Sequence, residues 1–196
     1  MNALDFRFHT GARSTDFVAT VGRRLAGGLE RLTSPARLTE WLAGAGVDVA
    51  GRQVSSRELQ QAQDLREAIY RLLLSRIAQG QATAQQQAAT ADIRAVNSWA
   101  RKRPATPQLA DDGSFALQKL VGEDAGTALG VIARDAIDVV TGERAAYLRA
   151  CEAGDCGMLY LDLSQGLTRR WCSMTECGNR AKVAAHRARR KEGAAS

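Results

Sequence analysis

The sequence predicts an α+β fold, in which a mainly helical N-terminal domain with short β elements precedes a small C-terminal module built around cysteines. Two observations support this prediction. Before residue 144, apolar residues recur at helical spacing, and aromatic residues make up only 5% of the chain. Beyond it, all four cysteines lie within the stretch 151–177. We therefore divide the 196-residue chain into a helical domain, 1–144, a cysteine module with a basic helix, 145–192, and a tail, 193–196.

Apolar periodicity predicts the helices of the N-terminal domain, and two of them have a recognisable start. Ser34 followed by Pro35 is the expected order of an N-cap and a first helical residue. Ser55 and Glu58 have the spacing of a capping box ahead of the longest helix. We expect the polar face of that helix, with Arg66, Arg71 and Arg76, to lie in solvent. The predicted helices span residues 15–32, 35–44, 55–80, 88–99 and 123–140.

Alternation of apolar and polar residues predicts short β elements. Leu4–Phe8 reads as a strand, and Pro107–Gln118 as a β-hairpin with its turn at 112–113. In the cysteine module, residues 158–163 alternate with a period of two. We expect that strand to pair with the residues at 168–172, so that the hairpin lies between the two cysteine pairs.

The cysteines form two pairs whose spacing favours a structural zinc site. Four residues separate Cys151 from Cys156 and Cys172 from Cys177, and fifteen separate the pairs. Such an arrangement is typical of a zinc ion held by two loops, and four thiolates would fill its tetrahedral coordination sphere. Two disulfides are the alternative, which a reducing compartment disfavours. A knuckle, a hairpin, a second knuckle and a helix together resemble a treble-clef finger.

A basic helix is predicted directly after the last cysteine. The net charge is +6 and the pI about 9.5, and residues 178–191 contain six Lys or Arg but no Asp or Glu. This concentration of positive charge favours an anionic partner, nucleic acid above all. The small apolar stripe at 181–188 is expected to pack on the hairpin. The candidate nucleic-acid contacts are Arg169, Arg170, Asn179, Arg180, Lys182, Arg187, Arg189, Arg190 and Lys191.

Structural roles are the alternative for the first residues of this helix. Asn179 would then cap the helix, and Arg180 would form an ion pair with Asp155 or Glu176. For the last turns, at 187–191, the alternative is a soluble tail without a partner.

Residues 177–180 spell CGNR at the second cysteine pair. The chain thereby resembles the CGNR zinc-finger family of bacterial proteins, in which the finger follows a helical ABATE domain described as a predicted stress-induced transcription regulator. Residues 16–20, DFVAT, resemble the family's DFVNT segment, with Ala19 where Asn is usual. The resemblance implies that the four cysteines bind zinc.

These observations predict a cytoplasmic transcription regulator that binds DNA through its finger and basic helix, while the helical domain senses a small molecule or forms a homodimer. The alternative is a zinc-stabilised interaction module whose basic tail meets an acidic protein. We expect no enzyme, because no Ser-His-Asp arrangement, P-loop or GxGxxG is visible. No apolar run approaches the roughly 20 residues that span a bilayer, and the N-terminus does not resemble a secretory signal. Candidates for a ligand pocket in the helical domain are Asp16, Phe17, Thr20, Arg23 and Trp41.

Overall fold

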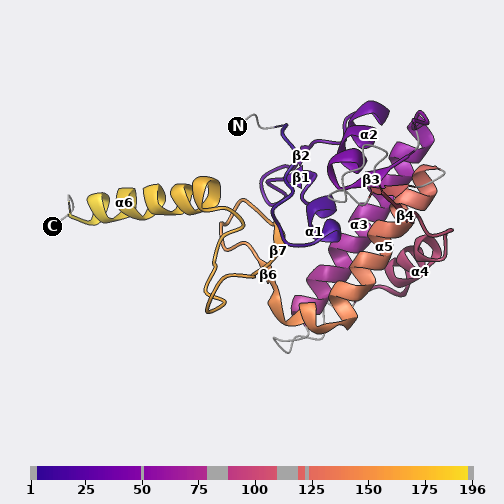
Figure 1. Cartoon of the computed structure of the whole chain (residues 1–196). Coiled ribbons are helices and arrows are strands. Elements are labelled where there is room, and N and C mark those ends of the chain that lie inside the picture. The colour runs from indigo at the N-terminus through magenta and orange to yellow at the C-terminus, as the bar shows by residue number, and fades with distance from the viewer. Residues whose placement is uncertain (1–3, 50, 79–87, 110–118, 122–123, 194–196) are drawn as a thin grey trace.

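The computed structural model describes residues 4–49, 51–78, 88–109, 119–121 and 124–193. A helical body carries the last helix as a projecting arm (Figure 1). The body is built on α3 (Ser56–Ala78) and α5 (Ala125–Thr141), which pack against each other and against α4 (Thr90–Ala100). Two shorter helices, α1 (Arg13–Val18) and α2 (Pro35–Gly44), complete it. No helix in the described part of the chain is both long and apolar enough to cross a membrane.

The predicted helix starts are confirmed. The Ser34 hydroxyl accepts a hydrogen bond from the backbone N–H of Arg37 (3.3 Å), and Pro35 is the first residue of α2. Ahead of α3, the N–H of Ser55 donates to Glu58 (2.7 Å) and the N–H of Glu58 donates to the Ser55 hydroxyl (3.2 Å). These contacts satisfy N–H groups that have no partner inside a helix. Local sequence therefore decides where both helices begin.

The core of the body lies between the long helices and beneath α1 and α2. Trp41 of α2 is fully buried, with its ring centroid 4.9 Å from that of Phe17 on α1. The faces of α3 and α5 predicted from the apolar period are confirmed as buried. They contribute Ala62, Leu65, Ile69 and Leu73 from α3, and Leu129, Ile132, Ala136 and Val139 from α5.

Short strands form three small sheets in the described part of the chain. β4 (Thr106–Gln108) pairs antiparallel with β5 (Lys119–Val121), which lies beyond the return strand predicted for the hairpin at 107–118, and the predicted turn at 112–113 lies outside the described residues. β3 (Val47–Asp48) adds to β5 in parallel, and two residues are too few for the sequence to show an alternation. The other sheets are β1 (Val21–Gly22) with β2 (Leu29–Glu30), and β6 (Leu148–Ala150) with β7 (Leu159–Leu161).

The predicted helix over 15–32 is wrong beyond its first turn. α1 ends at Val18, and the chain then forms the β1–β2 hairpin. Arg23, Gly27 and Gly28 have φ angles of 49°, 87° and 71°, a left-handed conformation that a right-handed helix excludes. The prediction is based on apolar residues every four positions, at Phe17, Val21, Leu25 and Leu29, but Leu25 is 65% exposed and so does not belong to a buried helix face.

The predicted strand at 4–8 is also wrong. Phe6 lies under the Arg37 guanidinium, 3.9 Å from it to the ring centroid, and Phe8 packs near Trp41 at 6.0 Å between ring centroids. These aromatic contacts hold the segment against α2 without a partner strand.

The prediction that Arg66 lies on a solvent-exposed face of α3 is wrong, because its side chain is buried. Its guanidinium donates to Glu30 (2.6 Å) and to Glu67 (2.9 Å), and these carboxylates compensate for the loss of water. The predicted end of α3 at Gly80, and the turn that follows it, lie outside the described residues.

Leu73→Ala should lower the free energy of unfolding by about 3 kcal/mol, because the fully buried side chain leaves a cavity when truncated. Leu163→Ala is the matched control, since Leu163 is 64% exposed and its truncation should change the free energy by less than about 0.5 kcal/mol. Urea unfolding followed by circular dichroism measures both values. Equal unfolding midpoints for the two variants would contradict this assignment of the core.

Candidate metal centre

The first cysteine pair sits in the connection between β6 and β7. The N–H of Cys151 donates to the carbonyl of Met158 (2.8 Å), which extends the β6–β7 ladder by one bond. The N–H of Cys156 then donates to the carbonyl of Ala153 (2.9 Å) and closes a tight turn. Gly157 follows with a φ of 64°, so the chain reverses there into β7. Both sulfurs therefore end on the inner side of one rigid loop.

The pairing predicted for the second half of this module is wrong. β7 pairs with β6, upstream of the cysteines, and residues 168–172 form no strand. Side chains hold that return segment instead. The Asp162 carboxylate accepts the N–H of Arg169 (2.9 Å), and the Tyr160 hydroxyl donates to the carbonyl of Arg169 (2.6 Å). An acceptor side chain thus replaces the ladder that the alternating pattern predicts.

The second cysteine pair leads directly into the arm. Cys177 lies in a π-helical turn, Met174–Gly178, which continues as α6 (Asn179–Gly193). The N–H of Cys172 donates to the sulfur of Cys151 (3.4 Å), so that a backbone dipole joins the two loops. The predicted helix behind the last cysteine is confirmed.

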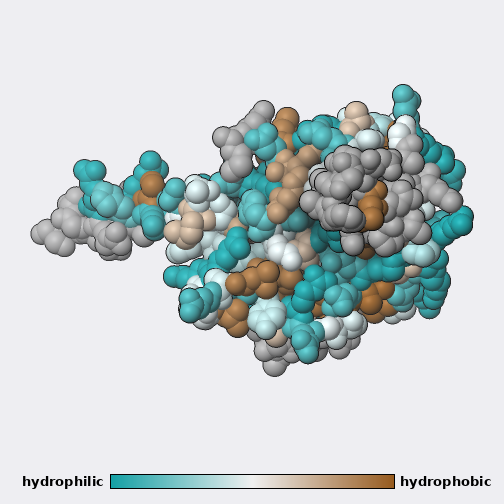
Figure 2. Space-filling model, in the orientation of Figure 1, coloured by the Kyte–Doolittle hydropathy of each residue, from teal (hydrophilic) through white to brown (hydrophobic). Residues whose placement is uncertain are grey.

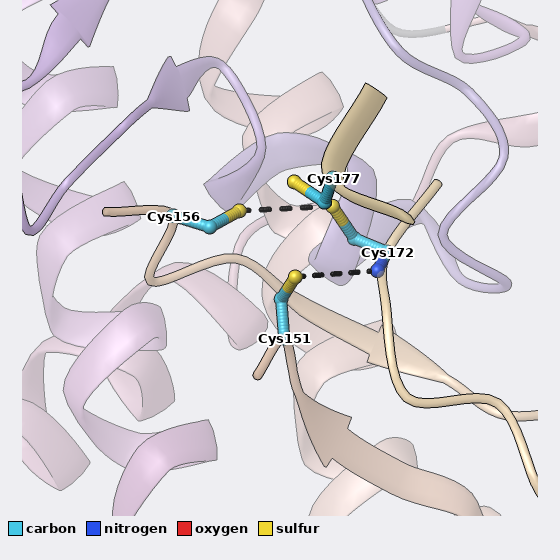
Figure 3. Close-up of side chains that lie close together, drawn as sticks. All are labelled: Cys151, Cys156, Cys172 and Cys177. Carbon is cyan, nitrogen blue, oxygen red and sulfur yellow. Dashed lines mark hydrogen bonds between the residues drawn. The ribbon is translucent and has the colours of Figure 1, made fainter. Parts of the chain in front are cut away.

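The four sulfurs converge on one point, as Figure 3 shows. All four lie within 4.8 Å of one another, and the four cysteines are buried. The Sγ atoms of Cys156 and Cys172 are 3.6 Å apart, and those of Cys172 and Cys177 are 3.5 Å apart. Tetrahedral zinc with Zn–S bonds near 2.3 Å needs sulfurs about 3.8 Å apart. A disulfide needs about 2.05 Å, and the four cysteines are free, so the disulfide alternative is wrong.

The pKa values of the four thiols also indicate that the cluster binds a cation. Hydrogen bonds to Cys151 and Cys156 raise the pKa of Cys172 well above its ordinary value, and burial raises that of Cys177. Their neighbour Cys151 has its pKa lowered to about 2, because Cys156 and Cys172 donate to it. Without a metal, one thiolate is therefore stabilised at the cost of the others. A divalent ion at the centre allows all four to ionise, and zinc fits this all-sulfur donor set.

Groups around the sulfurs complete the site. A terminal nitrogen of Arg180 lies 3.2 Å from the sulfur of Cys177 and 3.1 Å from the carboxylate of Asp155. Trp171 packs against the cysteine cluster and is half-buried. Such outer contacts fix the orientation of metal ligands and offset their charge.

The helical body contacts the loop that carries Cys151 and Cys156, which we call the first knuckle; the loop with Cys172 and Cys177 is the second knuckle. The N–H of Arg24 donates to the carbonyl of Cys156 (2.9 Å), and the Tyr70 hydroxyl donates to the carbonyl of Gly157 (3.0 Å). A Cβ on Gly157 would lie 3.0 Å from the Arg24 side chain, so the approach is close. The sequence gives no local signal for these contacts, since Tyr70 and Gly157 are 87 residues apart.

Arg7 holds the second knuckle in a similar way. It forms an ion pair with Glu176, in which the second nitrogen–oxygen contact measures 2.7 Å. The finger and the body are thus joined at both knuckles.

Two family models match the chain. Residues 11–143 match the ABATE family, described as "Putative stress-induced transcription regulator", and residues 147–190 match the CGNR zinc finger. The chain belongs to the ABATE family. It carries a CGNR zinc finger, as its sequence indicates, and its cofactor is structural zinc. A search of curated proteins gives no match to this chain.

The predicted nucleic-acid contacts fall into two groups, one near the zinc site of the CGNR finger and one farther along α6. Those near the zinc site make contacts within the protein. Arg169 donates to the carbonyl of Trp171 (2.8 Å) and lies over the Tyr160 ring, while Arg170 pairs with Glu152 (2.6 Å). The amide of Asn179 donates to the carbonyl of Thr175 (3.0 Å) and does not cap the helix, whereas Arg180 forms the ion pair with Asp155 that the sequence leaves open.

The remaining candidates lie farther along α6. Lys182, Arg187 and Arg190 are exposed, and within the described residues no ion pair involves them. Arg189 and Lys191 occupy the same helix. The predicted packing of the 181–188 stripe on the hairpin is wrong for Ala184, which is exposed, because the arm projects away from the finger (Figure 1).

The ABATE domain does not bring its candidate pocket residues into one cavity. Phe17 and Trp41 lie in the core, and the Thr20 hydroxyl donates to the carbonyl of Phe17 (2.7 Å). Asp16 accepts hydrogen bonds from Thr10, and burial raises the pKa of its carboxyl to about 6. Asp16 and Arg23 line different cavities, of about 410 Å³ and 640 Å³.

The 196-residue chain should contain one zinc ion, and Cys172→Ser should lose it, because three thiolates leave the coordination sphere open. Helical circular dichroism should also fall, since a helix of 15 residues is marginal without a nucleus. Zinc release to a colorimetric chelator and far-ultraviolet spectra measure both effects. Ser173→Ala is the control that should retain the metal. Full zinc content in Cys172→Ser would contradict a four-cysteine site.

Arg180→Ala should weaken zinc binding about tenfold, because it removes a charged donor from the sulfur of Cys177. The measurement is competition for zinc with a chelator of known affinity. Arg187→Ala removes the same charge farther along the helix and should leave the zinc affinity unchanged. If both variants bind zinc as tightly as the parent, the contact between Arg180 and Cys177 has no role in holding the metal.

Proposed function

We propose that this protein is a regulator without enzymatic activity, which binds DNA through α6 of its CGNR finger. The observation that carries this proposal is the shape of the arm together with its charge. α6 has 15 residues, a length of about 22 Å at 1.5 Å per residue. It projects from the body beyond its first two turns, and its first thirteen residues contain no Asp or Glu. A helix of this size fits the major groove of B-DNA.

The surface of the arm supports contact with phosphates. Figure 2 shows the described part of the arm as mainly hydrophilic, in contrast to the mixed surface of the body. Lys182, Arg187 and Arg190 are exposed there, and positions 189 and 191 add further cations to the helix. Lys and Arg side chains release counterions when they neutralise phosphates, and this release supplies affinity without sequence preference.

The zinc site supports the same proposal by fixing the base of the arm. Asn179 and Arg180 are held against the second knuckle, so the contact surface would begin at Lys182. A helix fixed at one end keeps a defined direction, because its first turn is already formed. The family description as a transcription regulator agrees with this role.

The double variant Arg187→Ala, Arg190→Ala should bind DNA more weakly and with a weaker dependence on salt. The slope of log affinity against log salt should become shallower by about 1.8, since each lost phosphate contact contributes about 0.9. Fluorescence anisotropy with a labelled duplex, between low and physiological salt, measures this slope.

The matched control is Arg57→Ala with Arg94→Ala, which removes two exposed arginines from α3 and α4. Its slope should equal that of the parent protein. An unchanged slope in the α6 variant, or no binding at low salt, would reject the proposal. Capture of an acidic protein that survives nuclease treatment and depends on Arg187 and Arg190 would favour the interaction module instead.

A further inference from the structure

A cavity of about 640 Å³ lies where three parts of the chain meet, beside the zinc ligands Cys156 and Cys177. One wall is the β1–β2 hairpin of the ABATE domain, the second is formed by the knuckles of the finger, and the third is the first two turns of α6. Cavities of about 300–1,000 Å³ are the usual size for small-molecule sites. Its position between two family-matched regions also makes it a place where a ligand would contact both.

The polar part of this cavity is dominated by arginine. Among the described residues that line it are Arg7, Arg23, Arg31, Arg180 and Arg187, and the anionic groups in the lining are the carboxylate of Glu176 and the zinc ligands Cys156 and Cys177. Ion pairs with Glu176 and Asp155 hold three of these head groups in place. A guanidinium has five N–H donors, so one ion pair leaves others for a second acceptor.

Arg31 is a buried cation in the wall of the cavity. The residue is 2% exposed, and its guanidinium donates to the carbonyl of Ala19 (3.2 Å); burial and the charge of Arg7 lower its pKa, while Glu176 and Glu30 raise it. Its guanidinium lies across Gly22, where a Cβ would come within 2.6 Å of a terminal nitrogen. Because Gly22 has no side chain, the Arg31 guanidinium has room in the cavity wall.

The remaining lining is apolar. Leu29, Met158 and Val183 come from the hairpin, the finger and the arm respectively, and Val183 is 49% exposed. Fixed guanidinium groups next to such a surface match a ligand with an anionic head and an apolar body.

We propose that this cavity binds a small organic anion, a carboxylate or phosphate with an apolar body, and that the bound anion weakens the interaction of α6 with DNA. The second half of this inference rests on the proposed function. Arg187 lines the cavity and also belongs to the proposed DNA surface, so an anion held there neutralises a phosphate contact. Affinity for DNA should therefore fall when the anion occupies the cavity, and bound DNA should lower the affinity for the anion by the same factor.

Binding is tested first on the zinc-loaded 196-residue chain without DNA, by isothermal titration calorimetry. The probes are phenyl phosphate and phenylacetate, which distinguish the two kinds of head group. Inorganic phosphate tests the head group alone, and 2-phenylethanol tests an uncharged ligand. We expect saturable binding of at least one aromatic anion, at least tenfold tighter than inorganic phosphate or the alcohol.

Two variants of exposed residues locate the site. Val183→Glu places a carboxylate in the apolar wall and Arg23→Ala removes a cation, and each should weaken binding of the anion at least fivefold. Arg57→Ala, on α3, should bind like the parent. Absence of saturable binding by both aromatic anions, or equal binding in all three variants, would overturn the proposal.

The regulatory half is tested by repeating the anisotropy titration with the bound anion at saturation. The affinity for DNA should fall at least threefold in the parent, and should not change in Val183→Glu relative to the same variant without anion. Anion binding with no effect on DNA would overturn the regulatory half alone. A protein that binds the anion but no DNA would contradict the proposed function and leave the anion site standing.

Discussion

The convergence of four sulfurs on one metal is the constraint on which the C-terminal part of this molecule depends. The strands there are three residues long, and beyond Ala181 the described side chains of α6 are exposed. Burial orders β6 and β7, since Leu148, Leu159 and Leu161 belong to the core of the body, and metal coordination orders the second cysteine pair and the base of α6. The zinc centre is also joined to the body through Arg24, Tyr70 and Arg7. The arm is consequently oriented with respect to the whole protein.

Features fixed by residues close together in the sequence were predictable. The caps at Ser34 and Ser55 and the cysteine pairs each depend on a few neighbouring positions, and the structure confirms them. The apolar faces of α3 and α5 were predictable for the same reason, because helical periodicity is a local property.

Features decided by distant partners were not predictable in this way. Arg66 looks like a solvated residue until Glu30 and Glu67 are placed beside it. The helix expected over 15–32 fails because left-handed residues such as Arg23, where glycine is usual, cannot be recognised from apolar spacing. In the finger, Asp162 takes the N–H of Arg169 that a β ladder was expected to use, and an alternating pattern does not reveal such a competing acceptor.

The exposure of α6 has a consequence for how such a protein diversifies. Substitutions in the body disturb a packed core, and substitutions among the cysteines disturb the metal, so both are constrained by folding. Beyond Arg180, the described side chains of the arm lie mostly in water, where replacement has a small effect on stability. Paralogues could therefore acquire different targets by changing a handful of arm positions, while the scaffold that presents them stays the same.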